Sequence, residues 1–252
     1  MTGIALDGVS KSFGGVAAVS ELSLTIPPAH MTGLIGPNGA GKTTVLNLIT
    51  GIVPPTAGQI AVGEQDITAA APETVARAGI ARTFQNIRLL REASVLENVM
   101  VGFHRHEETS LAANLLGLPS AWRERARFKE RARTMLDRFG MSRFATARAD
   151  SLSYGHQRRV EMMRAVATEP SFILLDEPVA GMNQIEAEEI GAILKTLVSD
   201  GIGILLIEHN VSFVMDLCST IYVMNTGRLI AAGNAATIQR DAAVIEAYLG
   251  AA

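Results

Sequence analysis

The segment with the most explicit chemical content reads GPNGAGKT and runs from Gly36 to Thr43. Its glycines let the backbone curl so that successive N–H groups point at a single anion. Lys42 adds a full positive charge, and Thr43 supplies the kind of hydroxyl that phosphate-binding loops offer to Mg²⁺. The spacing G-x-x-x-x-G-K-[ST] therefore predicts a phosphate-binding loop, with a ligand-free glycine turn as the alternative.

The segments on either side of this loop support the first interpretation. Met31 to Ile35 is a short apolar run typical of a buried strand, and Thr44 to Ile49 begins a helical pattern. A helix starting near Lys42 would add the positive end of its dipole to the loop. We therefore predict a nucleotide-binding loop formed by Gly36, Pro37, Asn38, Gly39, Ala40, Gly41, Lys42, Thr43 and Thr44.

The apolar run FILL is directly followed by a second group of chemically active residues, Asp176 and Glu177. Such a run is typical of a central parallel strand, and ligands in open α/β sheets bind outside the carboxyl ends of the strands. Asp176 can hold Mg²⁺ as a hard oxygen ligand, and Glu177 can orient or deprotonate a water in line with a γ-phosphate. Together with the loop, these carboxylates predict a nucleotide hydrolase. A kinase would also need an acceptor pocket, for which the sequence offers no candidate.

A second helix N-terminus lies in the segment SLSYGHQ, where Ser153 and Gly155 precede a helical stretch. The apolar residues of that stretch recur at helical spacing and are Val160, Met163, Val166 and Ala167. A serine at a helix N-terminus is a possible anion site. Because one nucleotide has no use for two such sites, we expect this one to serve a nucleotide bound by another copy.

Composition sets outer limits on the function. The chain has 252 residues, 48% of them hydrophobic, which suits one large domain or one domain with an inserted lobe. Its net charge of −3 gives no overall attraction to nucleic acid or anionic lipid. The single cysteine, Cys218, excludes an internal disulfide and suits a reducing cytosol. No apolar run approaches the ~18 residues of a membrane span, and we expect no signal peptide.

Short apolar runs alternate with helical patterns, which predicts an α/β fold with a mostly parallel sheet. Strands are expected at Ile4–Val9, Leu22–Ile26, Met31–Ile35, Gln59–Val62, Phe172–Glu177, Gly203–Glu208 and Thr220–Asn225, and a short helix at Ala71–Ala78. From about residue 95 to 150 the pattern is helical and predicts an insertion within one domain of residues 1–252. There, Trp122 to Phe139 interleaves arginines with acidic residues, which favours a solvated, salt-bridged face over a nucleic-acid-binding arm.

Over nearly its whole length the sequence resembles the ATP-binding cassette (ABC) ATPases. LSYGHQ is similar to their LSGGQ signature, and its serine lies 23 positions before Asp176 (176 − 153). The loop VAGMN, Val179 to Asn183, resembles the one that crosses between subunits in that family. The resemblance implies a P-loop NTPase core with a mostly parallel sheet, an antiparallel β subdomain and an inserted helical subdomain.

The resemblance also implies roles for individual residues. Phe13 matches the aromatic residue that stacks on adenine, and Gln85 matches the glutamine that joins the core to the helical lobe. The family pattern implies catalytic roles for Glu177 and His209, metal contacts for Thr43, Gln85 and Asp176, and contacts with the ATP of a partner chain for Ser153, Tyr154, Gly155 and His156.

Three positions depart from the common family pattern. Tyr154 replaces the first signature glycine, His156 replaces a glutamine, and Asn183 stands where many relatives carry aspartate. The tyrosine, the crossing loop and the ending IEAYLG, Ile245 to Gly250, resemble the ATPases of branched-chain amino-acid uptake systems. We therefore expect the ATP-hydrolysing subunit of a transporter that imports branched-chain or related hydrophobic amino acids.

The resemblance further implies ATP and Mg²⁺ as cofactors, together with a second ABC ATPase chain, a multi-spanning membrane permease and a solute-binding protein as partners. No nucleic-acid partner is expected, and the place of action is the cytoplasmic face of a bacterial inner membrane, as a peripheral subunit. The alternatives are an exporter ATPase of the lipopolysaccharide type, a soluble ABC ATPase acting on DNA or ribosomes, and a non-hydrolysing regulatory chain. The sequence leaves the cargo and the choice between homodimer and heterodimer open.

Overall fold

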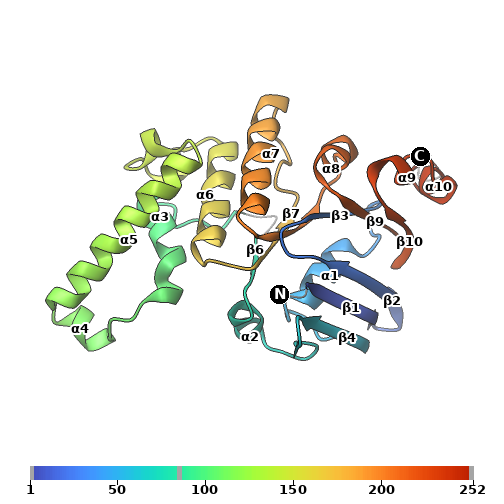
Figure 1. Cartoon of the computed structure of the whole chain (residues 1–252), viewed down its shortest axis with the longest axis horizontal. Coiled ribbons are helices and arrows are strands. Elements are labelled where there is room, and N and C mark those ends of the chain that lie inside the picture. The colour runs from blue at the N-terminus through green and yellow to red at the C-terminus, as the bar shows by residue number, and fades with distance from the viewer. Residues whose placement is uncertain (1–2, 84–86, 250–252) are drawn as a thin grey trace. The chain divides into compact units, whose positions relative to one another are not determined.

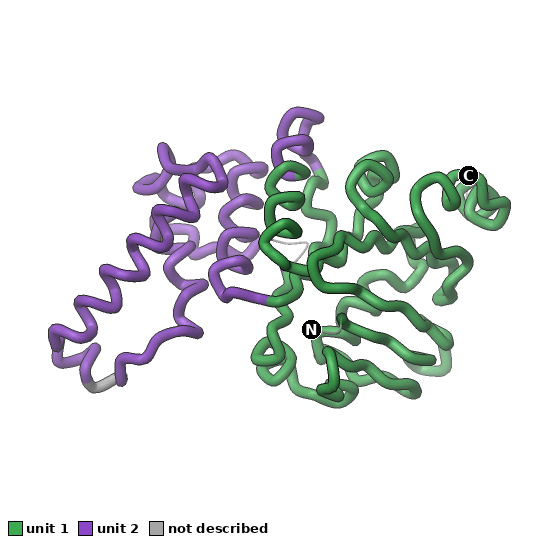
Figure 2. Tube along the Cα trace, in the orientation of Figure 1, with its two compact units in different colours: residues 1–82, 171–180, 191–252 green, residues 83–170, 181–190 purple. Residues whose placement is uncertain are grey.

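The computed structural model describes residues 3–83 and 87–249, without the side chains of residues 111, 112 and 249. The chain forms two compact units, which are coloured separately in Figure 2. Unit 1 comprises residues 1–82, 171–180 and 191–252, and unit 2 comprises residues 83–170 and 181–190. The chain therefore leaves unit 1 after Arg82, builds most of unit 2, and returns at Ser171.

Unit 1 contains an antiparallel sheet with the strand order β2-β1-β4-β5 (Figure 1). Its strands are β1 (Ile4–Phe13), β2 (Val16–Ile26), β4 (Ala57–Val62) and β5 (Gln65–Asp66). Ile4 and Leu6 of β1 are buried while Ala5 and Asp7, which alternate with them, are exposed, as expected of a sheet with one buried face.

A second sheet of unit 1 has the order β10-β9-β3-β8-β7-β6. Its strands are β3 (Met31–Ile35), β6 (Ile80–Arg82), β7 (Phe172–Asp176), β8 (Gly203–Ile207), β9 (Thr220–Asn225) and β10 (Arg228–Gly233). Neighbouring strands run parallel except for β10, which is antiparallel to β9. Every residue of β3, β7 and β8 is buried, and each large aliphatic side chain buried in this way contributes ~1.5–3 kcal/mol. The predicted α/β class with a mostly parallel sheet is confirmed.

The helices of unit 1 are α1 (Lys42–Ile49), α2 (Pro72–Arg77), α8 (Val211–Leu217), α9 (Ala235–Ile238) and α10 (Ala242–Leu249). Helix α7 (Gln184–Ser199) begins in unit 2 and ends in unit 1. Helix α1 buries Val45, Leu46, Leu48 and Ile49, and these side chains join Leu34, Leu174 and Leu205 of the sheet in one core cluster.

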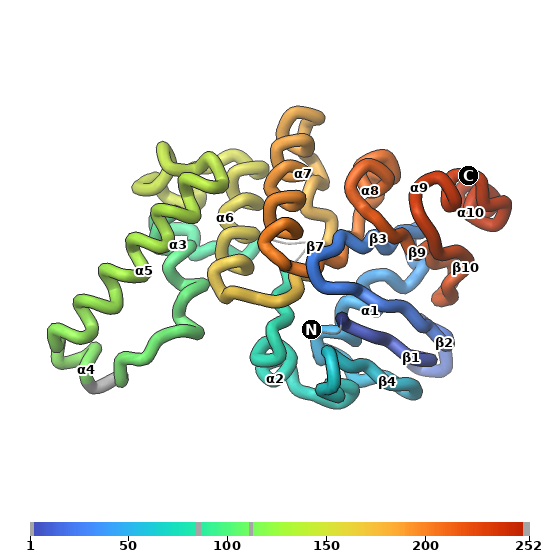
Figure 3. The backbone as a smooth tube through the Cα atoms, in the orientation of Figure 1, coloured from blue at the N-terminus to red at the C-terminus, as the bar shows by residue number. Residues whose placement is uncertain are grey.

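In unit 2, the elements between residues 95 and 150 are all helices or 3-10 turns, joined by short loops. Its helices are α3 (Val95–Gly102), α4 (Leu111–Leu115), α5 (Pro119–Arg138) and α6 (Tyr154–Ala167), with 3-10 turns at Phe103–His106, Ser142–Phe144 and Ala149–Ser151. Helix α3 packs against both α5 and α6 (Figure 3). Ser94 caps α3 and exchanges hydrogen bonds with Glu97 in a capping box, which fixes where the helix begins.

Helix α5 buries only the stripe Phe128, Ala132 and Leu136, which recurs every four residues. Its exposed face carries the ion pair between Arg133 and Glu130, which lie three residues apart. This is the solvated, salt-bridged face predicted from the interleaved charges. Among the described residues, no helix combines the length and the apolarity that crossing a bilayer requires.

The first hairpin extends beyond its predicted limits. Strand β1 continues to Phe13 and β2 begins at Val16, because the antiparallel ladder pairs Ser12 with Ala17 and Phe13 with Val16 across the Gly14–Gly15 turn. Backbone hydrogen bonds stabilise this part of the hairpin. Its side chains are mostly exposed, so the sequence there has no alternating apolar pattern that would predict a strand. The sequence pattern does not predict strands β5, β6 and β10 either. Strands β5 and β6 are very short, and β10 contains several small residues.

Candidate nucleotide site

The strand register of unit 1 brings its predicted chemical groups to one edge. Leu34 of β3 and Asp176 of β7 both lie beside Ile207 of the strand between them, β8. Because the three strands are parallel, their carboxyl ends lie at the same edge. The glycine loop follows β3, Glu177 follows β7, and the segment Glu208–His209 follows β8.

Lys42 lies in the centre of the glycine loop and is only 7% exposed. Its Nζ donates hydrogen bonds to the carbonyl oxygens of Gly36 at 2.7 Å and of Pro37 at 3.0 Å. Burial lowers the pKa of the ammonium group, whereas the carboxylates of Glu177 and Asp176 act in the opposite direction. The Lys42 ammonium group is thus fixed against the backbone of the loop and interacts electrostatically with the carboxylates of Glu177 and Asp176.

Two glycines of the loop are required by their surroundings. A Cβ at Gly36 would lie 2.1 Å from the carbonyl oxygen of Met224, and a Cβ at Gly41 would lie 2.5 Å from that of Ala18. Gly41 is also the N-cap of α1, with φ 100 and no side-chain cap, so the first amides of the helix are left for a ligand or water. Thr43 is exposed at the start of this helix.

Asp176 is nearly fully buried and forms an ion pair with Arg82, with 3.2 Å between Oδ2 and Nη2. Nη1 of the same guanidinium donates to Oδ1 of Asn47 on α1 at 2.6 Å. Arg82 therefore ties the carboxyl end of β7 to the helix that follows the glycine loop. Sequence reasoning did not identify Arg82, because its partners lie far from it along the chain.

Glu177 has a backbone φ of 51, in the left-handed region that non-glycine residues rarely adopt. Its N–H donates to the carbonyl oxygen of Ile207 at 2.9 Å, which holds this conformation. Its Oε1 lies 2.6 Å from Nε2 of His209. A backbone conformation of this kind is energetically costly, and such conformations cluster at active sites and ligand-binding segments.

Glu208, between the end of β8 and His209, is a second residue that sequence reasoning did not identify. It is 3% exposed, and its carboxylate accepts the N–H of Val179 at 2.8 Å and the N–H of His209 at 3.2 Å. Burial raises the pKa of this carboxyl group, and these hydrogen bonds act in the opposite direction. Glu208 thereby joins the segments after β7 and β8. A glutamate inside an otherwise apolar strand end was the available signal.

Phe13 lies at the end of β1 and is 49% exposed. Nζ of Lys11 lies 5.1 Å from the centroid of its ring, within cation–π range. The residue is therefore a surface aromatic group beside a positive charge, and not part of the core.

The predicted signature residues lie in unit 2, at the start of α6. Ser153 is the N-cap, and its hydroxyl accepts the N–H of His156 at 3.4 Å. A Cβ at Gly155 would lie 3.0 Å from Oε1 of Glu186, so this glycine permits close approach of α7. Tyr154 is 47% exposed.

Asn183, in the predicted crossing loop, caps the start of α7. Its Oδ1 accepts the N–H of Glu186 at 3.0 Å, and its own N–H donates to Oε2 of Glu186 at 3.1 Å. An aspartate could accept the same hydrogen bond, so the asparagine keeps the cap and removes one negative charge.

The structure thus brings Lys42, Asp176, Glu177 and His209 together in unit 1, and Ser153 to His156 together in unit 2. Gln85 lies outside the described residues. The groups available for Mg²⁺ in the described part of unit 1 are the Thr43 hydroxyl and the Asp176 carboxylate, which are hard oxygen donors. No cluster of three or more His, Cys, Asp or Glu exists among the described residues.

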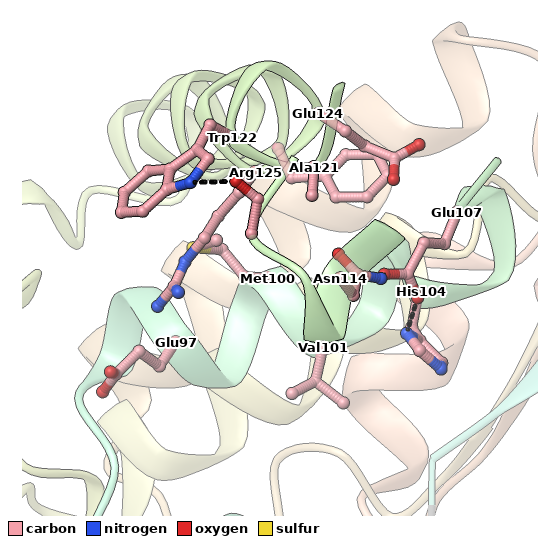
Figure 4. A pocket seen from close by; sticks show the side chains of 12 residues that line it. Glu97, Met100, Val101, His104, Glu107, Asn114, Ala121, Trp122, Glu124 and Arg125 are labelled. Atoms are coloured by element: carbon pink, nitrogen blue, oxygen red, sulfur yellow. Dashed lines mark hydrogen bonds and ion pairs between the residues drawn. The ribbon is translucent and has the colours of Figure 1, made fainter. Parts of the chain in front are cut away.

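A hollow of about 640 Å³ within unit 2 lies between α3 and the first part of α5 (Figure 4). Met100 and Val101 contribute apolar surface to it, and Trp122 of α5 donates from Nε1 to the carbonyl oxygen of Gly117 at 3.1 Å. None of the predicted site residues that the structure describes lines this hollow, so it is separate from the predicted nucleotide contacts.

Comparison with known protein families decides the identity of this arrangement. The sequence model of the family described as "ABC transporter" matches residues 19–180, which include the glycine loop, the signature segment and Asp176–Glu177. The chain belongs to the ABC transporter family. It is an ABC-type ATPase, and the resemblance stated from its motifs is confirmed. A second model, described as "Branched-chain amino acid ATP-binding cassette transporter", matches residues 228–252.

Individual relatives of this ABC ATPase cover nearly its full length. The high-affinity branched-chain amino acid transport ATP-binding protein LivG of Escherichia coli K12 is 41% identical over 99% of this chain and 98% of its own. The lipopolysaccharide export system ATP-binding protein LptB of the same strain is 34% identical, with the same two coverages. Among solved structures, the ADP conformation of the ATP-binding cassette MJ1267 superposes with a TM-score of 0.85, at 31% identity and 99% coverage of both chains.

Proposed function

We propose that this ABC ATPase powers the import of branched-chain or related hydrophobic amino acids. Two similarities support this cargo. LivG, a branched-chain amino acid transport protein by name, is 41% identical over nearly the full length, and the model that matches residues 228–252 describes a branched-chain amino acid transporter family. The hydrolytic part of the proposal rests on one observation above all, the contact of 2.6 Å between Glu177 and His209 at the carboxyl edge of the parallel sheet.

In this proposal Lys42 and the free amides at the start of α1 bind the phosphates of ATP, because together they present a positive charge and several N–H donors. The remaining loop residues shape this cradle, and the exposed ring of Phe13 stacks on adenine. Thr43, Asp176 and Gln85 would hold Mg²⁺, and the ion, when bound, neutralises charge on the phosphates. Arg82 keeps the Asp176 carboxylate in place.

Glu177 is the proposed general base. Its carboxylate accepts a proton from the water that attacks the γ-phosphate, and its left-handed backbone sets the direction of the side chain. His209 contacts both this carboxylate and, in the proposal, the γ-phosphate. Glu208 fixes the two segments by accepting amides from each, so that the base and the histidine keep their mutual position.

The proposed active form is a pair of ABC ATPase chains that closes over two molecules of ATP. Ser153, Tyr154, Gly155 and His156 of each chain would contact the nucleotide held by the other. A solved relative at 25% identity, with a TM-score of 0.78 over 92% of this chain, is described as a dimeric ABC transporter cassette. Hydrolysis removes the γ-phosphate that both halves neutralise, and the pair separates.

We also propose that residues 1–252 are a single ABC ATPase domain in which residues 95–150 form the helical insertion. This insertion would pass the motion to a multi-spanning permease near Gln85, with a solute-binding protein delivering the cargo. The place of action is the cytoplasmic face of a bacterial inner membrane, and no nucleic acid is involved.

A lipopolysaccharide-type exporter is the second candidate, because LptB is 34% identical over the same length. The two can be separated by deleting the gene in the source cell and measuring uptake of labelled leucine, isoleucine and valine. Import predicts that uptake falls and is restored by the wild-type chain but not by Glu177→Gln. Normal uptake would contradict the import proposal. A pull-down from detergent-solubilised membranes should recover a permease with the chain, and recovery of soluble DNA or ribosome partners alone would contradict any transport role.

A further inference from the structure

Ser153 and His156 are in contact through two separate hydrogen bonds. Nδ1 of His156 lies 2.8 Å from Oγ of Ser153, and the backbone N–H of His156 donates to the same oxygen at 3.4 Å. The second of these is the N-cap of α6. The first is peculiar to a chain with histidine at this position, because only an imidazole places a ring nitrogen there.

Counting the hydrogen-bonding capacity of the Ser153 hydroxyl shows why this contact matters. A hydroxyl has one donor and two acceptor positions, and the N-cap occupies one acceptor. When Nδ1 carries no proton, it can only accept, so the hydroxyl turns its proton toward the imidazole. The outer side of Oγ then offers only a lone pair. When Nδ1 carries a proton, it donates to the second acceptor position, and the hydroxyl proton is free to point outward.

We propose that His156 is a positioning residue that controls the direction of the Ser153 hydroxyl. A proton on Nδ1 turns Ser153 into a hydrogen-bond donor for the γ-phosphate of an ATP held by a partner chain, and its loss turns the donor inward. This inference rests on the proposed function, because it takes the contact of Ser153 with the partner's ATP as given.

The groups around the imidazole of His156 determine its protonation state in the absence of ATP. The Phe144 ring lies against it, with 4.5 Å between centroids. Burial lowers the pKa of His156, as do the charges of Arg159 on α6 and Arg143 in the 3-10 turn, while Glu186 and Glu189 of α7 raise it. The lowered pKa favours the uncharged imidazole at neutral pH before ATP arrives. In this proposal its single proton is on Nε2, so that Nδ1 accepts the hydrogen bond of the Ser153 hydroxyl. An anion beside Ser153 favours the positive form, so ATP bound in the pair should draw a proton onto Nδ1.

Nitrogen NMR on the full chain labelled with ¹⁵N-histidine tests this directly. The chain has five histidines, and the His156 signals are those that disappear in His156→Gln. In the free chain at neutral pH we expect an unprotonated Nδ1. In the ATP-bound pair, held by Glu177→Gln, we expect a protonated Nδ1. An Nδ1 that stays unprotonated in the ATP-bound pair would overturn the proposal.

A double-mutant cycle separates positioning from a merely structural role. ATP-driven pairing is compared between about pH 5.5 and 8 for the wild type, His156→Gln, Ser153→Ala and the double variant. His156→Gln should flatten the pH dependence and weaken pairing by about tenfold where the imidazole is protonated, which is ~1.4 kcal/mol. In the Ser153→Ala background, His156→Gln should have no further effect. An equal effect in both backgrounds would show that His156 does not act through Ser153.

Two comparisons complete the test. His30→Gln changes an exposed histidine outside the site and should leave both pairing and its pH dependence unaltered. Failure of the proposed function has a different signature from failure of this inference. If the wild type does not pair when ATP is added, both the proposed function and the inference about His156 are wrong. If the wild type pairs while Nδ1 stays unprotonated, only the positioning role of His156 is wrong.

Discussion

Oε1 of Glu177 and Nε2 of His209 lie 2.6 Å apart, although the two residues follow different strands of the parallel sheet. The register between β7 and β8 places Asp176 beside Ile207, so each strand delivers its next residues to the same place. Glu177 is additionally held by its N–H, which donates to Ile207. The contact is therefore a product of sheet geometry, and replacing either side chain should leave the backbone that carries it intact.

Replacing Glu177 by glutamine removes the proposed base while keeping the size of the side chain. We expect turnover to fall at least ~100-fold, since general base catalysis contributes factors of this order, with ATP binding retained. Phosphate release measures turnover, and gel filtration with ATP should show a longer-lived pair. The matched control is Glu64→Gln, at an exposed glutamate of a turn. Near-normal hydrolysis by Glu177→Gln would exclude Glu177 as the base.

Lys42→Ala should act on binding itself. The variant loses a charge-assisted contact to phosphate, and we expect the affinity for ATP to fall about tenfold or more. Isothermal titration calorimetry with ATP and Mg²⁺ gives the dissociation constant directly. Lys195→Ala, at an exposed position of α7, removes the same charge elsewhere and should leave the constant unchanged. Equal affinities for the wild type and Lys42→Ala would contradict the assignment of the loop.

Removing Arg82 should destabilise the chain more than removing an exposed arginine. Arg82→Met leaves the buried carboxylate of Asp176 without its ion pair, which costs ~3–5 kcal/mol of the free energy of unfolding in comparable cases. Arg133→Met breaks an exposed pair with Glu130 and should cost no more than ~1 kcal/mol. Urea unfolding at neutral pH compares the two variants. Similar, small losses in both would show that the Arg82–Asp176 pair contributes little.

Cys218 provides a pH-dependent test of the core. Burial raises the pKa of its thiol from 9.0 to about 12. The folded state thus holds this proton more tightly than the unfolded state. The contribution of the thiol to stability is complete below about pH 9 and is lost as the pH rises toward 12. Cys218→Ala should lack this loss.

Because the chain has one cysteine, thiol labelling reports on Cys218 alone. We expect the native chain to react slowly with a disulfide reagent at about pH 9, where an exposed cysteine is half ionised, and to react fully in urea. Fast labelling of the native chain would contradict the buried, protonated thiol.

The parts that could be predicted from the sequence are those in which local pattern and final environment agree. Strands β3, β7 and β8 are buried along their whole length, so each appears as a short, mostly apolar run, and α1 begins at Lys42 as its loop motif indicates. Asp176 at the end of β7 and Glu177 directly after it were identifiable because strand ends carry ligands in such sheets.

The parts that could not be predicted depend on which segments meet in space. Arg82 follows no motif of its own and gains its meaning only when β6 pairs with β7 and brings it to Asp176. Glu208 gives no sign in the sequence that Val179 will donate an amide to it. Similarly, nothing in the spacing of Ser153 and His156 states which ring nitrogen will face the hydroxyl. Tertiary register supplies the first two relationships, whereas the third is a local contact within the first turn of α6.

The strand that leads into the glycine loop has both of its partners late in the chain. Met31 and Thr32 of β3 pair with Ile204 of β8 and Thr220 of β9. During synthesis the loop therefore emerges long before the two strands that fix it, and non-local pairings of this kind form slowly. A nascent chain cannot complete the pairing of β3 until β8 and β9, which end at Ile207 and Asn225, have left the ribosome. Gain of ATP binding accordingly marks completion of the whole parallel sheet, which makes nucleotide affinity a probe of folding.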